Sequence, residues 1–133
     1  MRYLIMGSAE IARHLTDAIN LRGSKVIVLN DCRDLEDHSF QNANVIYNVY
    51  TGCLMEDLQR AKIASVDGFL ACSDDDNRNT MAAQIATQIF HVPLVLCHVG
   101  NGLKATAYKE MGLEVVSSTV MVADNIFLRL ENS

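Results

Sequence analysis

The amino-terminal stretch RYLIMGSAEIARHL, residues 2–15, joins an apolar run to an amphipathic pattern through a single glycine. Residues 2–6 are apolar enough to form a strand that is buried on both faces. Beyond the glycine, apolar residues recur at helical spacing, which predicts a helix over residues 9–22. A buried strand, a glycine turn and a helix in this order are the first unit of a doubly wound α/β fold.

Strand and helix patterns alternate along the rest of the chain. The predicted strands are residues 2–6, 25–29, 45–49, 68–71, 94–97 and 114–116, and the predicted helices are 9–22, 55–61, 76–90, 101–111 and about 119–131. Residues 34–44 carry only a weak pattern. This alternation predicts an α/β, Rossmann-like doubly wound parallel six-stranded sheet of order 3-2-1-4-5-6, with helices on both faces.

The size and charge of the chain limit the class of protein. Its 133 residues suit one domain, residues 1–133, and its formal net charge of -5 argues against a nucleic-acid-binding surface. No apolar run reaches the roughly 20 residues that span a bilayer, and the first residues form a strand pattern rather than a signal peptide. We therefore expect a cytoplasmic protein with no nucleic-acid partner and no direct membrane insertion.

The carboxyl ends of the predicted strands are the expected ligand site, because such a sheet binds at the reversal between its first and fourth strands. The turn there lacks two of the three glycines of the pattern G-x-G-x-x-G. Gly7 keeps the first position, and Ala12 is still small at the third, but Ala9 places a methyl group where a phosphate oxygen would pack. Glu10 adds a negative charge that opposes a phosphate.

The end of the second predicted strand also departs from the nucleotide-binding pattern. An acid at that position normally accepts the ribose hydroxyls, but this chain has Asn30 with Asp31 beside it. The residues alone leave two alternatives open. One is a mono- or dinucleotide site of altered chemistry, and the other is a Rossmann-like frame that has lost or changed its ligand.

Further stretches add a more specific pattern. They are RGSKVIVLND at residues 22–31, LMEDLQRAKIASVDGFLACSDDDNRNTMAAQIA at 54–86, VPLVLCHVGN at 92–101 and YKEMGLEVVSS at 108–118. Together with the opening stretch they resemble, nearly end to end, the Trk/Ktr amino-terminal domain, also called the TrkA-N, RCK or KTN domain. The second stretch is the most specific, and its matching positions are Ala61, Ile63, Asp67, Ala71, Ser73, Asp75 and Asn79.

The resemblance implies a regulatory function without catalysis. Domains of this family sense a cytoplasmic nucleotide, often NAD(H), ATP or ADP, and pass a conformational change to a membrane pore. They usually pair through the last helix, and the dimers build a gating ring. We therefore expect a cytoplasmic homodimer that acts on a membrane potassium channel or transporter subunit.

The resemblance also implies which residues contact the nucleotide. Carried over by position, they are Gly7, Ser8, Ala9, Glu10, Ile11, Asn30, Asp31, Thr51, Gly52, Cys53, Cys72, Ser73 and His98. Glu10 and His98 stand where the family often has a neutral or basic residue and an arginine, and Tyr50-Thr51 replaces a Gly-Asp pair. Because these departures reduce the positive charge near a phosphate, we hypothesise that AMP fits better than NAD(H) or ATP.

Two rival classes of protein remain. A small NAD-dependent oxidoreductase would need a proton donor, and the Tyr-x-x-x-Lys pair that usually supplies it follows none of the four tyrosines. An interaction module that has lost its ligand is the other rival, and the degraded glycine turn favours it. Ligand binding without turnover would separate a regulator from both.

Three other features have a structural and a functional interpretation. The cysteines Cys32, Cys53, Cys72 and Cys97 suit small buried residues better than a thiol sensor or a soft-metal site. Asp74, Asp75 and Asp76 suit a helix cap better than a cation site. The last helix is apolar most of the way round, so we expect one side in the core and the other at a dimer contact.

Overall fold

The computed structural model of the protein describes residues 1–7, 9–30 and 44–133. One six-stranded parallel sheet has the order β3-β2-β1-β4-β5-β6, with β1 beside β4 at the centre. The predicted Rossmann-like doubly wound α/β fold and its strand order are therefore confirmed. The predictions made for Ser8, Asp31 and Cys32, and nearly all of the weakly patterned segment, lie outside the described residues.

The elements agree closely with the predicted ones. The strands are β1 (Arg2–Gly7), β2 (Lys25–Asn30), β3 (Val45–Val49), β4 (Gly68–Cys72), β5 (Leu94–His98) and β6 (Val115–Val116). The helices are α1 (Ala9–Leu21), α2 (Leu54–Arg60), α3 (Asp76–Gln88), α4 (Gly102–Glu110) and α5 (Ser118–Glu131). A short 3₁₀ turn, η3 (Ile63–Ser65), was not predicted. None of the described helices is both long and apolar enough to cross a membrane.

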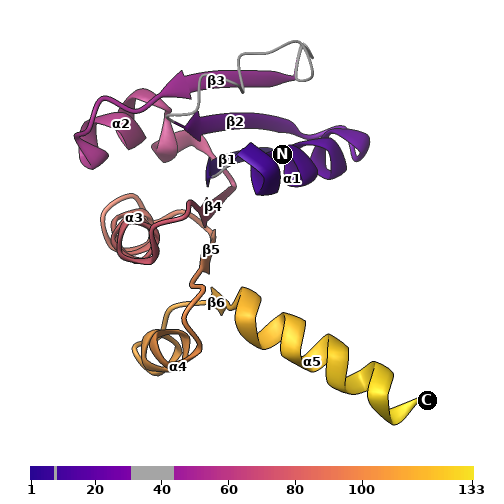
Figure 1. Cartoon of the computed structure of the whole chain (residues 1–133). Coiled ribbons are helices and arrows are strands. Elements are labelled where there is room, and N and C mark those ends of the chain that lie inside the picture. The colour runs from indigo at the N-terminus through magenta and orange to yellow at the C-terminus, as the bar shows by residue number, and fades with distance from the viewer. Residues whose placement is uncertain (8, 31–43) are drawn as a thin grey trace.

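The core consists of two apolar layers, one on each face of the sheet. Figure 1 shows α2, α3 and α4 on one face and α1 on the other. Because side chains alternate along a strand, Leu4 of β1 belongs to the larger cluster with Phe69, and Ile5 belongs to the smaller cluster with Val28 and Ala12. The central strands are thus covered on both faces, as their continuous apolar runs predicted.

The expectation that one side of the last helix lies in the core is wrong. No residue of α5 is buried, and Phe127 and Leu130 are 61% and 65% exposed. Figure 1 shows this helix, in yellow, leaving the sheet at β6 and pointing away from it. Ser117 alone separates β6 from α5, and its hydroxyl already caps the helix at the N–H of Val120. β6 is an edge strand of only two residues, so α5 begins at the margin of the sheet and leaves none of its residues buried.

One buried side chain ties the carboxyl ends of β4 and β5 together. Asn79, in the first turns of α3, is fully buried. Its amide nitrogen donates to the carbonyl oxygens of Ser73 at 2.8 Å and His98 at 2.9 Å. Its amide oxygen accepts from the N–H of Ser73 at 2.9 Å and from the Ser73 hydroxyl at 2.6 Å. The full donor and acceptor capacity of one amide thus sets the position of α3 against the sheet.

We predict that Asn79→Asp destabilises the fold more than its small change in shape suggests. The carboxyl group loses the two N–H donors, so the carbonyl oxygens of Ser73 and His98 face an oxygen. The expected cost is about 2 kcal/mol, measured as a fall in the free energy of urea unfolding. Asn77→Asp, an exposed change in the same turn, is the matched control and should cost nothing. Equal stability of Asn79→Asp and wild type would contradict this account.

Candidate nucleotide site

Gly7, the last residue of β1, lies at the centre of the carboxyl edge. A Cβ atom at this position would lie 2.9 Å from the carbonyl oxygen of Cys72 and 3.0 Å from its Cβ. Gly7 and Cys72 are register partners in the β1–β4 pair, so the two strands approach closely here. Its φ is not in the left-handed region. The glycine is thus required for strand packing, and not for a left-handed turn.

The rest of the predicted phosphate turn is described only in part. Ser8 and the side chain of Ala9 lie outside what the structure describes. Glu10 is exposed in the first turn of α1. Ile11 is half-buried and lines an apolar groove on the α1 face of the sheet. The exposed carboxylate of Glu10 agrees with the expectation of negative charge near this turn.

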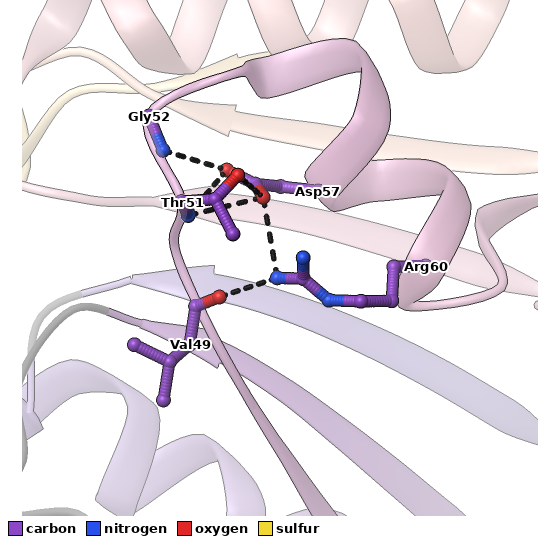
Figure 2. A network of polar contacts seen from close by, with 5 residues as sticks. All are labelled: Val49, Thr51, Gly52, Asp57 and Arg60. Atoms are coloured by element: carbon purple, nitrogen blue, oxygen red, sulfur yellow. Dashed lines mark hydrogen bonds and ion pairs between the residues drawn. The ribbon is translucent and has the colours of Figure 1, made fainter.

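The loop after β3 is held by a buried carboxylate, as Figure 2 shows. Asp57 of α2 is fully buried, and its carboxylate accepts from the hydroxyl of Thr51 at 2.6 Å and from the N–H groups of Thr51 and Gly52 at 3.1 and 3.3 Å. Arg60 pairs with the same carboxylate at 3.2 Å and also donates to the carbonyl of Val49. These contacts fix Thr51 and Gly52, two of the residues expected to contact the nucleotide, and the next residue, Cys53, is the N-cap of α2.

The hydrogen bonds of this network keep Asp57 charged. Burial alone would raise the pKa of its carboxyl group. The hydrogen bonds from Thr51 and Gly52, together with the charge of Arg60, outweigh burial and lower the pKa of Asp57 below its usual value. Gly52 has a φ of 103°, a conformation that a residue with a side chain rarely adopts.

A cavity of about 290 Å³ opens beside this loop. Its lining residues are Tyr50, Thr51, Gly52, Leu54, Asp57 and Arg78. The guanidinium of Arg78, from the first turn of α3, lies over the Tyr50 ring with its central carbon 5.1 Å from the ring centroid. A volume near the lower end of small-molecule sites suits one nucleobase with part of its ribose better than a whole dinucleotide.

Asn30 lies near this cavity through strand pairing. It ends β2 in register with Val49 of β3, so Tyr50 and the loop follow directly beyond its neighbour. Asn30 is 6% exposed. Its neighbour Asp31 lies outside the described residues. Three of the predicted site residues therefore lie together where β2 and β3 end: Asn30, Thr51 and Gly52.

A second cavity, the apolar groove, lies on the α1 face of the sheet and also measures about 290 Å³. Its lining residues are Ile11, Leu15, Leu70, Cys72, Leu96, Cys97, His98, Val116, Ser118 and Met121. Both ring nitrogens of His98 are buried and have no hydrogen-bond partner among the described residues. The structure thus separates the predicted residues into two groups, with Ile11, Cys72 and His98 in the groove and Thr51 and Gly52 at the polar cavity.

Cys72 and Cys97 behave as small, largely buried residues, whereas Cys53 is exposed, contrary to the prediction, and Cys32 lies outside the described residues. Burial raises the pKa of Cys72 to about 11 and that of Cys97 to about 12, where the charges of Cys72 and Asp76 add to the effect. Both thiols are therefore protonated at neutral pH. Among the described residues, no three histidine, cysteine or acidic side chains come together as a metal site would require.

The acidic run before α3 serves as a structural cap. Asp75 is the N-cap and accepts from the N–H groups of Asn77 and Arg78 at 3.0 and 3.1 Å. Asp76 accepts from the N–H groups of Gly100 at 2.9 Å and Asn101 at 3.3 Å, which ties the loop after β5 to α3. These contacts support the cap and use the charge that a cation would need.

The comparison with protein families identifies the domain. Residues 3–119 match the model of the TrkA-N domain. The chain belongs to the TrkA-N domain family. The resemblance inferred from the sequence is therefore confirmed for most of the chain.

Individual relatives agree with this assignment. Over 134 aligned residues, the TrkA-N domain is 27% identical to the Trk system potassium uptake protein TrkA of Streptomyces coelicolor, covering 98% of this chain. The chain spans 58% of that relative's length. Its fold matches the Kef CTD of Shewanella denitrificans, solved in an AMP-bound form, with a TM-score of 0.79, 13% identity and coverage of 100% of this chain and 83% of the other. It also matches the GsuK RCK domain with a TM-score of 0.77, 16% identity and coverage of 98% and 28%.

Sequence reasoning missed three residues of the carboxyl edge as parts of the site. Asp57 and Asn79 each satisfy several backbone groups there, and Arg78 lines the polar cavity. One signal for Arg78 was available, because a cation in the first turn of a helix opposes the helix dipole. A residue that breaks a local rule often serves a function.

We predict that Asp57→Asn lowers stability in a pH-dependent way. Since the folded-state pKa of Asp57 is depressed, its contribution is full above the unfolded pKa of about 4 and is lost as the pH falls through the folded pKa. At pH 7 the substitution should cost about 1–3 kcal/mol, because an amide turns donors toward Thr51, Gly52 and Arg60.

The measurement is thermal unfolding of both proteins at several pH values. The difference in stability between the wild type and Asp57→Asn should become smaller toward about pH 3. Asp17→Asn, at an exposed position of α1, is the matched control and should leave the wild-type curve unchanged. A stability difference that does not change with pH would show that the charge of Asp57 contributes nothing to folding stability.

Proposed function

We propose that this TrkA-N domain is a cytoplasmic regulatory domain of a potassium channel or transporter and that it senses an adenine nucleotide. The observation that carries the proposal is the polar cavity between the loop after β3 and the first turn of α3. It lies at the edge of the sheet where doubly wound folds bind nucleotides. The potassium uptake relative and the AMP-bound Kef domain of the same fold support the proposal.

The preferred ligand in this proposal is AMP rather than NAD(H), ADP or ATP. Glu10 places an exposed carboxylate in the first turn of α1, next to the expected phosphate position. His98, where the family often has an arginine, lines the apolar groove instead of presenting a cation. Each added 5′-phosphate therefore meets more negative charge and gains no positive partner at this turn.

A regulator rather than an enzyme is the second part of the proposal. The Cys72 and Cys97 thiols are held in the protonated form, which is a poor nucleophile. The apolar groove is lined by no aspartate, glutamate, lysine or arginine side chain. Binding without turnover is the behaviour that this arrangement favours.

The signal in this proposal passes through a homodimer, which in the family builds a gating ring. All of α5 is exposed, including Val122, Ile126 and Phe127. The apolar groove lies on the same face of the sheet as α1, over β4, β5 and β6, and none of the described helices lies across it. A second copy of α5 offers the apolar surface that such a groove needs. In such a dimer, α5 of each chain would pack in the apolar groove of the other chain.

We predict that the purified protein binds AMP more tightly than ATP or NADH in isothermal titration. The reason is the negative charge of Glu10, so Glu10→Gln should increase the affinity for ATP more than the affinity for AMP. Glu110→Gln, an exposed change at the far end of α4, is the matched control and should alter neither. Tight NADH binding with no AMP binding would overturn the ligand preference, and release of a modified nucleotide during incubation would contradict the regulatory assignment.

We predict that Phe127→Asp converts the dimer into a monomer. A carboxylate buried at the interface without a counter-charge costs more free energy of association than the remaining contacts at this position contribute. Sedimentation of the wild type and the variant measures the change. Leu21→Asp, at a more exposed apolar position at the end of α1, is the control and should remain dimeric. A wild type that is already monomeric, or an unchanged variant, would remove α5 from the interface.

A further inference from the structure

Arg78 occupies a position where a positive charge has no local benefit. It lies in the first turn of α3, where the exposed helix N–H groups already carry partial positive charge. Its backbone N–H donates to Asp75, which caps the helix. The side chain, however, lies over the ring of Tyr50 at the polar cavity. Its location is therefore explained by the cavity rather than by the helix.

Arg78 also forms no ion pair with an acidic side chain among the residues that the structure describes. Within residues 1–7, 9–30 and 44–133, the ion pair that the structure contains joins Arg60 to Asp57. Asp57 binds the loop after β3, and Asp76 binds the loop after β5. The guanidinium keeps its five N–H donors, of which none bonds to a described residue. A planar group of this kind is suited to a phosphate.

Strand pairing relates Arg78 to the ribose end of the site. Asn30 ends β2 in register with Val49, and Tyr50 follows Val49 directly. Arg78 lies over the ring of Tyr50, which follows the strand partner of Asn30, the residue at the ribose-contact position of doubly wound folds. An acid there selects a free 2′-hydroxyl, and a nearby arginine accommodates a 2′-phosphate. At this position the chain has the neutral Asn30, followed in the sequence by Asp31, and Arg78 lies over Tyr50 at the end of the neighbouring strand.

We propose that Arg78 makes this site select adenosine ligands that carry a second phosphate on the ribose 2′-hydroxyl. The inference rests on the proposed nucleotide-sensing function and names the ligand class of that same cavity. A preference for a 2′-phosphate is compatible with the preference for a single 5′-phosphate, because the 2′- and 5′-phosphates occupy different places in the site. Glu10 disfavours extension of the 5′-phosphate, and Arg78 favours the phosphate at the other side of the ribose.

The test compares three nucleotides by isothermal titration. AMP and adenosine 2′,5′-bisphosphate differ only in the 2′-phosphate, and ADP carries the same number of phosphates in a different place. The wild type should bind the bisphosphate about tenfold or more tightly than AMP, as one charge-assisted contact allows. It should also bind the bisphosphate more tightly than ADP, which separates recognition from a general attraction to charge.

Arg78→Ala should remove this preference, because it should weaken binding of the bisphosphate by about tenfold more than binding of AMP. Because Arg78 is exposed and alanine favours a helix, the variant should unfold at the wild-type temperature. Arg22→Ala is the matched control, since Arg22 is an exposed arginine at the opposite edge of the sheet, and it should keep the preference.

Three results would overturn the inference: equal affinity of the wild type for AMP and the bisphosphate, a preference that survives Arg78→Ala, or an equal loss of both ligands in that variant. The last result would assign Arg78 to the adenine ring. AMP binding without a 2′-phosphate preference would leave the proposed function in place. Binding of no adenine nucleotide would refute both.

Discussion

The amide of Asn79 is the interaction on which the carboxyl edge depends. It satisfies the backbone of Ser73 and His98 at once, so the ends of β4 and β5 and the start of α3 hold one arrangement. Successive side chains of an α-helix are about 100° apart around the axis. With Asn79 directed at the sheet, the preceding residue, Arg78, turns to the side, toward Tyr50. A buried polar group thereby sets the direction of an exposed charged one.

The fold was predictable because its signal is spread over many residues. Continuous apolar runs gave the strands, and their alternation with helical patterns gave the order of the sheet. The place of α5 was not predictable in the same way. Its apolar residues are those of a core helix, and nothing in their spacing tells whether the surface that covers them belongs to the same chain. The structure shows α5 beyond the edge strand β6 with none of its residues buried in its own chain.

The candidate site was predictable as an edge but not as a set of contacts. The predicted residues lie at or just beyond the ends of strands, yet those of them that line a cavity divide between two cavities of opposite character. The sequence shows at which strand end a residue lies. The face of the sheet to which its side chain points depends on the register and twist of the strands. His98 illustrates this, because its backbone joins the Asn79 network while its ring lies in the apolar groove. Asp57 could not be recognised from sequence, since one acid within a polar helix gives no sign of burial.

The close approach of β1 to β4 changes what the first glycine of the turn can tell. A side chain at Gly7 would collide with the backbone of Cys72 whether or not a ligand is present. A descendant of this chain that lost every trace of nucleotide binding would therefore still need that glycine. In searches for nucleotide-binding members of such folds, Gly7 reports the architecture alone, and the evidence for a ligand has to come from positions that the sheet leaves free to vary.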